Sequence, residues 1–170
     1  MSASDVFSMS MGSFVTKIFS SADTLVGDKH GNFLFGLQGN DTLDGQKGND
    51  TLIGGAGKDK LTGGAGKDKF KFTKPTEGGD TIKDFSASQG DKLVFVSPNF
   101  GNLKKGTLSA SNFLASKDGK ATGSGQRFVF NTKTGTLSYD ADGNGSAAAV
   151  TVATLNVKSL KAGDILIAAS

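Results

Sequence analysis

The sequence predicts an all-β protein, built as a stacked array of short parallel strands with a cap at each end. The first observation is a run of four nine-residue units, starting at Gly36, Gly45, Gly54 and Gly63. A fixed short period is typical of a stacked, repetitive structure. The second observation is that the chain after the repeats contains β-branched and aromatic runs separated by glycine-containing turns, a pattern typical of antiparallel strands.

Each repeat unit is expected to form a six-residue turn followed by a three-residue strand. Glycine stands at positions one and four, aspartate at position six and a bulky apolar residue at position eight. Glycine permits positive φ, so the glycine pair is expected to bend the turn and aim its carbonyl groups at one point. Alternation along the strand places position eight inward and positions seven and nine outward. The glycines are Gly36, Gly39, Gly45, Gly48, Gly54, Gly57, Gly63 and Gly66, the acids Asp41, Asp50, Asp59 and Asp68, and the apolar residues Leu43, Leu52, Leu61 and Phe70.

Two units make one coil of 18 residues, with their strands on opposite walls. Turns on the same edge of the coil are then stacked at the strand spacing of about 4.8 Å. This places Asp41 beside Asp59, and Asp50 beside Asp68. Two carboxylates and several backbone carbonyls form an all-oxygen site, which suits Ca²⁺ better than Mg²⁺ or Zn²⁺.

Two weaker units precede the four regular ones and extend the array to residues 18–72, or about six units. IFSSADTLV keeps Asp23 in phase, and GDKHGNFLF keeps Asn32 in phase. Sites at 23/41 and 32/50 would have to form without the paired glycines, which these first turns lack. Residues 1–17 are mixed apolar and serine, and we expect one or two strands there that cap the open end, because uncapped ends invite aggregation.

The four units resemble the repeats of RTX (repeats-in-toxin) proteins. That resemblance implies a right-handed parallel β-roll with Ca²⁺ between the turns. It also implies that the stretch DTIKDF closes the last calcium sites, with Asp80 and Asp84 as candidate ligands. An ordinary strand with exposed aspartates is the alternative for this stretch. The resemblance further implies an extracellular protein that leaves the cell through type I secretion machinery, guided by an uncleaved C-terminal signal.

Residues 73–170 are expected to form an antiparallel sheet or sandwich packed on the end of the roll. One short helix near residues 109–115, two hairpins through residues 131–135 and through ADGNG, and a final apolar strand are predicted. Asp140, Asp142 and Asn144 have the D-x-D-x-N spacing of an EF-hand loop, but Thr151 stands where that loop needs Glu. A polar hairpin turn and a weak extra Ca²⁺ site both remain open.

The charged residues are 19 Lys and Arg against 16 Asp and Glu, a formal net charge of +3. Lys58, Lys60, Lys67 and Lys69 occupy positions five and seven of their repeats, which face outward. They either solubilise an exposed wall or form a basic face for an anionic polysaccharide or cell surface. A single Arg and few aromatic residues among the lysines argue against nucleic acid as a partner.

The sequence argues against an enzyme. It has no HExxH, no GxSxG and a single histidine, His30, so neither a zinc-protease site nor a catalytic triad can be assembled. No cysteine is present, no apolar run is long enough to span a membrane, and the N-terminus lacks the features of a cleaved signal peptide.

Two function classes remain. One is a free-standing secreted Ca²⁺-binding protein, and Met1 followed by a plausible cap favours this expectation. The other is an export and folding module of a larger protein, with no ligand other than Ca²⁺.

Overall fold

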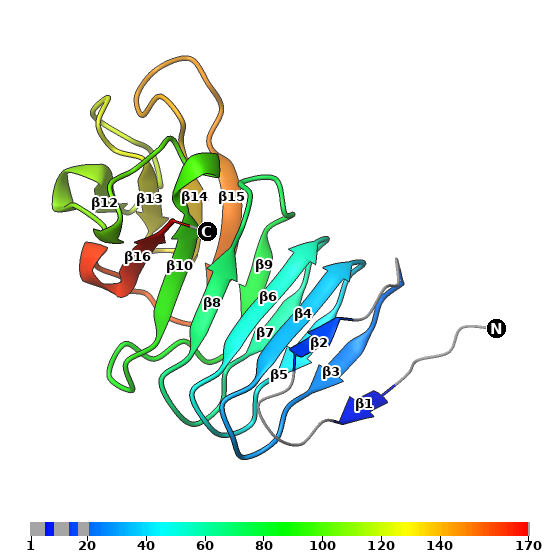
Figure 1. Cartoon of the computed structure of the whole chain (residues 1–170). Helices are drawn as coiled ribbons and strands as arrows, with labels where there is room; N and C mark the ends of the chain where they lie inside the picture. Colours follow the sequence, from blue (N-terminus) through cyan, green and yellow to red (C-terminus); the bar gives the residue numbers. More distant parts are fainter. Residues whose placement is uncertain (1–5, 9–13, 17–20, 170) are drawn as a thin grey trace.

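The computed structural model describes residues 6–8, 14–16 and 21–169 of the 170-residue chain. Its strands form two sheets, which face each other as the two walls of a flattened coil (Figure 1). Wall A contains, in spatial order, β1 (Val6–Ser8), β3 (Thr24–Val26), β5 (Thr42–Asp44), β7 (Lys60–Thr62), β9 (Asp80–Ile82), β15 (Val150–Leu155), β14 (Thr136–Tyr139), β13 (Phe128–Asn131) and β12 (Phe113–Ser116). Wall B contains β11 (Gly106–Thr107), β16 (Ile165–Ala168), β10 (Lys92–Val96), β8 (Lys69–Phe72), β6 (Thr51–Ala56), β4 (Phe33–Gln38) and β2 (Phe14–Thr16).

The chain alternates between the walls, so successive repeats contribute strands to opposite sheets. All pairs from β1 to β9 on wall A and from β2 to β10 on wall B are parallel. Within the repeats the register is 18 residues, as in Leu25↔Leu43 and Leu34↔Leu52. The all-β fold and the parallel β-roll predicted from the period are therefore confirmed.

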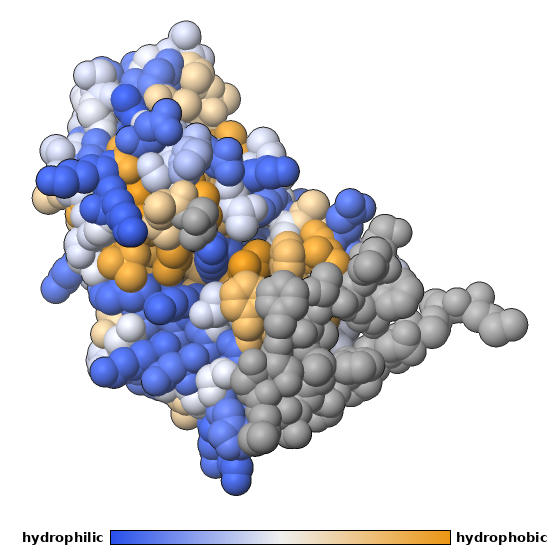
Figure 2. Space-filling model, in the orientation of Figure 1, coloured by the Kyte–Doolittle hydropathy of each residue, from blue (hydrophilic) through white to orange (hydrophobic). Residues whose placement is uncertain are grey.

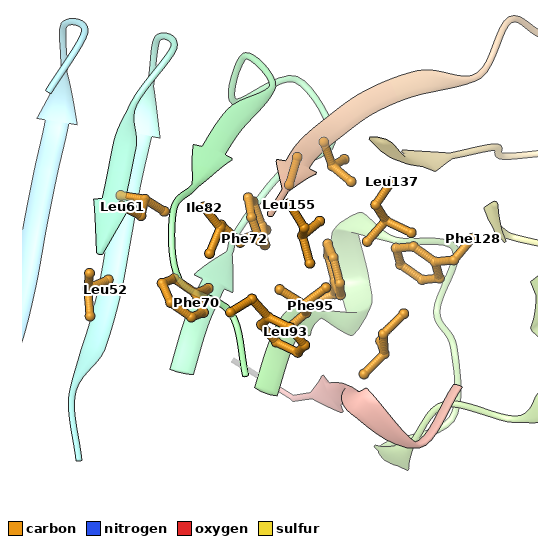
Figure 3. Packing of buried hydrophobic residues seen from close by; sticks show 14 of the residues in the cluster. Leu52, Leu61, Phe70, Phe72, Ile82, Leu93, Phe95, Phe128, Leu137 and Leu155 are labelled. Carbon is orange, nitrogen blue, oxygen red and sulfur yellow. The ribbon is translucent and has the colours of Figure 1, made fainter. Parts of the chain in front are cut away.

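The position-eight residues form the core between the walls. Leu25, Leu43 and Leu61 point inward from wall A and are at most 1% exposed. Leu34, Leu52 and Phe70 face them from wall B. Figure 3 shows Leu52, Leu61, Phe70 and Ile82 packed between the ribbons. Since one repeat contributes only one such side chain, each unit is stabilised by burial against its neighbours.

The nine-residue period ends after β8, and the next coil is longer. Asp59 and Asp80, which hold equivalent positions, are 21 residues apart, and Asp68 and Asp91 are 23 apart. These spacings exceed the 18-residue coil by three and five residues respectively. The extra residues are accommodated in the turns, so β9 and β10 keep the parallel pairing of the roll.

The C-terminal region continues both walls. The two predicted hairpins are present, because β13 pairs antiparallel with β14 and β14 with β15. However, β15 pairs in parallel with β9, and β16 in parallel with β10, so the cap extends the sheets of the roll instead of forming a separate antiparallel unit. Between the walls the core becomes aromatic, with Phe95, Phe100, Phe128 and Tyr139 in ring contact.

The predicted helix near residues 109–115 is shorter than expected. Only a 3₁₀ turn, Ala110–Asn112, is present, and Ser109 lies at its N-cap, where its side chain accepts a hydrogen bond from the amide of Ser111. From Phe113 the chain is the strand β12, which pairs with β13. Pairing with a neighbouring strand thus outweighs the local helical signal.

The predicted N-terminal cap falls largely outside the described residues. The two described pieces, β1 and β2, pair in parallel with β3 and β4. They therefore prolong the two walls. No helix in the described part of the chain is long and apolar enough to cross a membrane.

Candidate metal centre

Acidic side chains form a ladder along each edge of the roll. On one edge the order is Asp23, Asp41, Asp59 and Asp80, and on the other it is Asn32, Asp50, Asp68 and Asp91. At every rung the Oδ1 atom of an aspartate accepts a hydrogen bond from the backbone N–H of the equivalent residue one coil earlier. The Asp41 amide, for example, lies 2.7 Å from Asp59 Oδ1, and the Asp50 amide 2.9 Å from Asp68 Oδ1. The stacking of Asp41 on Asp59 and of Asp50 on Asp68 thus follows the predicted 18-residue coil.

The second carboxylate oxygen of these aspartates points into the turn. The Oδ2 atoms of Asp50, Asp59 and Asp68 are buried and have no hydrogen-bond partner. Each of these residues is only 1% exposed. A buried carboxylate oxygen without a partner is costly, by about 1–3 kcal/mol or more for a charged group. Three such atoms at equivalent positions indicate that the turns are built around a cation.

Backbone carbonyl groups converge on the same places. A Cβ atom built on Gly45 would lie 2.4 Å from Asp50 Oδ2 and 2.6 Å from the carbonyl oxygen of Gly63 in the next coil. The equivalent atom on Gly36 would lie 2.4 Å from Asp41 Oδ2 and 2.5 Å from the Gly54 carbonyl oxygen. The two oxygens therefore face one small volume in front of the glycine, which must stay free of a side chain.

This geometry corrects the expected role of the first glycine in each repeat. The position-four glycines do have positive φ, between 118° for Gly48 and 148° for Gly66. The position-one glycines are not among the residues with positive φ, so they are needed for space and not for a left-handed backbone. Position two is left-handed instead, and it is occupied by Leu37 and Gln46 in the first two regular units and by Gly55 and Gly64 in the next two.

The electrostatics of the ladders disfavour the charged carboxylates when no cation neutralises them. Burial, together with the charges of Asp68, Asp28 and Asp44, raises the pKa of Asp50 to about 6. Burial and the charges of Asp59 and Glu77 raise the pKa of Asp80 to about 8. The pKa values of Asp59, Asp68 and Asp91 are also raised, in each case mainly by burial.

The two acids predicted to close the ladders have different environments. Asp80 is 2% exposed and occupies the rung after Asp59, whose amide it binds at 3.1 Å. Asp84 does not occupy the rung after Asp68. Its two oxygens accept hydrogen bonds from the consecutive amides of Gly63 and Gly64, at 2.9 and 2.7 Å. One coil earlier, the amide of the equivalent residue Gly45 donates to the backbone carbonyl of Thr62. The carboxylate of Asp84 therefore takes the place of such a carbonyl for the Gly63 amide.

Sequence reasoning missed Asp91, which closes the second ladder. Its Oδ1 accepts from the Asp68 amide at 3.0 Å, its Oδ2 accepts from the Ser86 amide at 2.8 Å, and it is 2% exposed. A signal was present, because Asp91-Lys92-Leu93 repeats the Asp-Lys-apolar triplet of Asp59-Lys60-Leu61. The five extra residues in the last coil moved this triplet out of phase.

The degenerate early turns adopt the same arrangement as the regular ones. Asn32 is 7% exposed, and its amide donates to Asp50 Oδ1 at 2.6 Å. A Cβ on Gly27 would lie 2.2 Å from Asn32 Oδ1 and 2.8 Å from the Gly45 carbonyl oxygen. Asp23 is 4% exposed, and its amide donates to Asp41 Oδ1 at 2.8 Å.

The loop with the EF-hand-like spacing lies away from the ladders, between β14 and β15. Asp140 is buried and its Oδ1 accepts from the Asp142 amide, while Asp142 Oδ2 accepts from the Ala147 amide at 3.0 Å. Asn144 is exposed. These contacts are those of a polar turn, and an additional Ca²⁺ site here stays a prediction.

No group of three or more carboxylate, imidazole or thiol side chains able to hold a metal gathers within the described part of the chain. A site in the turns must therefore draw several of its ligands from backbone carbonyls. Ca²⁺ accepts such mixed oxygen ligands with flexible geometry, whereas Zn²⁺ prefers nitrogen and sulfur ligands. The residues present fit Ca²⁺.

Two parallel walls joined by glycine-rich acidic turns define a calcium-binding β-roll. In a scan against protein families, residues 19–52 and 35–70 match the RTX calcium-binding nonapeptide repeat, in four copies. Residues 19–70 therefore form an array of RTX-type calcium-binding repeats.

Solved structures support the same assignment. Matching chains include the solution structure of the AlgE6R3 subunit from the Azotobacter vinelandii mannuronan C5-epimerase, which is 29% identical in sequence. The match covers 94% of the present chain and 84% of that chain, with a TM-score of 0.58. The search of curated protein sequences gave no match.

Proposed function

We propose that this chain is a non-catalytic module that folds outside the cell when Ca²⁺ occupies its two carboxylate ladders. The observation that carries this proposal is the set of buried Oδ2 atoms of Asp50, Asp59 and Asp68 without hydrogen-bond partners. The ions would be held by carboxylates of the ladders and by turn carbonyls such as those of Gly54 and Gly63. The bound ions would supply the positive charge that makes these buried carboxylates stable.

The chain's own residues explain why folding would wait for calcium. Stacked carboxylates repel one another across coils, as the effect of the Asp68 charge on the pKa of Asp50 indicates. The glycine-rich turns also lose much conformational freedom on folding. A ligand bound only by the native state adds its binding free energy to stability. A low-calcium cytosol would therefore keep the array loose, and millimolar extracellular calcium would order it, consistent with type I export guided by an uncleaved C-terminal signal.

The test is to measure circular dichroism and hydrogen exchange of the full chain in chelator and in millimolar Ca²⁺, and to count bound ions by native mass spectrometry. We expect ordered β-structure and several bound ions only with calcium. The Asp50→Asn/Asp68→Asn variant should lose bound ions. The control Asp44→Asn, at an outward strand position, should retain them, because Asn keeps the oxygen that accepts from the Gln46 amide. An identical rigid β signature with and without calcium, and no bound ions, would overturn the proposal.

A second function, binding of an anionic polysaccharide, is favoured by two observations. The similar AlgE6R3 subunit belongs to an enzyme named for mannuronan, a polymer of uronic acid. Lysines of the repeats are exposed, including Lys58, Lys60, Lys67 and Lys69. The competing possibility is an export and folding module with no other ligand. Pull-down on uronate polymers and whole cells, with and without Ca²⁺, separates these two possibilities. Only polysaccharide binding predicts that the chain is captured when calcium is present and not when it is absent.

A further inference from the structure

We infer that the polysaccharide-binding surface lies on the outer face of wall B, where Lys69, Lys71 and Lys92 come together on the neighbouring strands β8 and β10. The ligand class is a linear polyuronate lying across the strands. This inference rests on the proposed polysaccharide binding and gives it a location.

The lysines of the repeats do not share one face, contrary to the expectation of a single basic wall. Lys60 belongs to β7 on wall A, and Lys69 belongs to β8 on wall B. Successive repeats alternate between the walls, so their position-seven residues point in opposite directions. A binding surface must therefore be sought on one wall at a time.

Wall B brings its lysines closest together. Lys69 pairs with Lys92 across β8 and β10, and Lys71 follows two residues along β8. These spacings correspond to about 4.8 Å between strands and about 6.6 Å along a strand. Like charges at opposed strand positions destabilise a sheet, so this cluster needs a reason other than stability. An anionic polymer that bridges the ammonium groups would provide one.

Four neighbouring strands of wall B carry no acidic residue, and Asp164, just before β16, is the acid that reaches the lysine cluster. The sequences of β4, β6, β8 and β10 contain no Asp or Glu, whereas wall A carries the outward Asp44 beside Thr62. Among the described residues, Lys92 is the only Lys or Arg within 4.0 Å of a carboxylate, and its partner Asp164 is 3.9 Å away. The ladder aspartates are buried in the turns, and neither Lys69 nor Lys71 forms an ion pair within the described part of the chain.

The outward-facing apolar residues next to these lysines are covered. Ile53 on β6 and Val94 on β10 are only 4% and 7% exposed. Figure 2 shows hydrophilic surface over the lower parts of β8 and β10, bordered by hydrophobic surface over β4 and β6 and around β16. A sugar chain over these strands would have its carboxylates near the ammonium groups and its C–H groups against the bordering hydrophobic surface.

The same surface fits a lipid membrane poorly. Binding in a membrane interface requires apolar side chains that reach into the acyl boundary. Among the described residues, Val150 is the most exposed large hydrophobic residue, at 37%, and it lies in β15 on wall A. A polymer that rests on the surface suits wall B better than a bilayer.

Calcium should strengthen this binding. The unliganded chain has a formal net charge of +3, and each bound Ca²⁺ adds two positive charges at the edges of the walls. The potential over wall B therefore becomes more positive as the ladders fill. Because coupling between two ligands is reciprocal, the polyuronate should in turn raise the affinity for calcium.

The test measures binding of short oligomannuronates to the full chain by calorimetry and by amide chemical-shift mapping, at fixed Ca²⁺ and moderate salt. The test variant is Lys69→Gln/Lys71→Gln. The matched control, Lys60→Gln/Lys83→Gln, removes the same charge from the outward side of wall A. We expect about a tenfold loss of affinity in the test variant and less than a threefold loss in the control. The shifted amides should lie in β6, β8 and β10.

Each alternative result has a defined meaning. Equal losses of oligomannuronate affinity in both variants, or amide chemical-shift changes confined to β5, β7 and β9, would show that the binding surface is not on wall B. Polysaccharide binding itself would remain supported. Absence of any binding by the calcium-loaded wild type overturns the polysaccharide function and this inference together. Binding to phosphatidylglycerol vesicles but not to oligomannuronate overturns the choice of ligand. Retained calcium counts by native mass spectrometry show that neither variant has lost its fold.

Discussion

Single residues decide how closely two coils approach. At position one of a repeat, any side chain would enter the volume shared by a carboxylate oxygen and a carbonyl of the next coil, as at Gly45. At position four, the backbone itself is left-handed, as at Gly48 with φ of 118°. The same residue type is thus required for two different physical reasons.

We predict that Gly45→Ala strongly weakens the calcium-loaded fold. The new methyl group would lie 2.4 Å from Asp50 Oδ2 and 2.6 Å from the Gly63 carbonyl oxygen, and both belong to the site. Overpacking of this kind costs about 1–3 kcal/mol, and displaced ligands add to it. Urea unfolding in millimolar calcium measures the loss. Gly163→Ala is the control, because a Cβ there meets nothing within 4 Å. Equal stability of the two variants would contradict the steric role.

We predict the opposite sign for Gln46→Gly. Gln46 has φ of 67°, in a region where a side chain costs about 1–2 kcal/mol. Glycine removes that strain but adds about 0.4–1 kcal/mol of unfolded-state freedom, so the net gain should be up to about 1 kcal/mol. Thermal unfolding of Gln46→Gly and of the control Gln38→Gly gives the comparison. Gln38 lies in β4 without positive φ, so glycine there should destabilise. Destabilisation by both changes would rule out strain at position two.

At the scale of elements, the last coil determines how the ladders end. Asp80 and Asp91 end coils that are three and five residues longer than the 18-residue coil, yet each accepts a hydrogen bond from the amide of the preceding rung. Asp84 accepts hydrogen bonds from the amides of Gly63 and Gly64, and for Gly63 it takes the place of the backbone carbonyl of a further coil. Side chains here replace the hydrogen bonds that another repeat would have made.

We predict that Asp91→Ala loosens the junction between β8 and β10. It would leave the buried amide of Asp68 and the amide of Ser86 without their acceptors, a loss of about 2–4 kcal/mol. The rate of amide hydrogen exchange should increase first in β8 and β10. Asp44→Ala, which removes a carboxylate from a less buried strand position, should cost less than about 1 kcal/mol. If both substitutions had equal effects, Asp91 would not close the ladder.

The sequence predicts most of these elements because its period determines the register. Once Asp41 and Asp59 are placed one coil apart, the inward direction of Leu43 and Leu61 follows. Where the period stops, prediction becomes weaker. Insertions moved Asp91 out of phase, and tertiary pairing placed residues 113–115 of the expected helix in the strand β12. The parallel joins of β15 to β9 and of β16 to β10 leave no local signal, because they connect segments about 70 residues apart.

At the scale of the whole molecule, the raised carboxyl pKa values predict an unusual pH dependence. In metal-free protein the folded-state pKa is about 8 for Asp80 and about 6 for Asp50, both above the unfolded value of 3.8. The folded state therefore binds more protons than the unfolded state. The contribution of these two groups to stability is greatest below pH 4 and is lost as the pH rises through 6 and 8. We expect a loss of several kcal/mol between pH 5 and pH 8 for the metal-free chain, most of it from Asp80.

Calcium should reverse this trend, because the metal binds the deprotonated carboxylates. Urea midpoints at pH 5 and pH 8, in metal-depleted buffer and in millimolar Ca²⁺, give the four measurements needed. Metal-free stability that rises with pH would contradict the buried, unneutralised state of Asp50 and Asp80.

The direction of the ladder bonds gives the roll a polarity. Each aspartate accepts a hydrogen bond from an amide of the preceding coil, so every turn is stabilised by the turn one coil later in the chain. Order should therefore spread backwards, from the capped C-terminal coil towards the first repeat. Truncation from the N-terminus should therefore remove coils one at a time without disordering the rest. Truncation from the C-terminus should remove the coil on which the preceding coils become ordered.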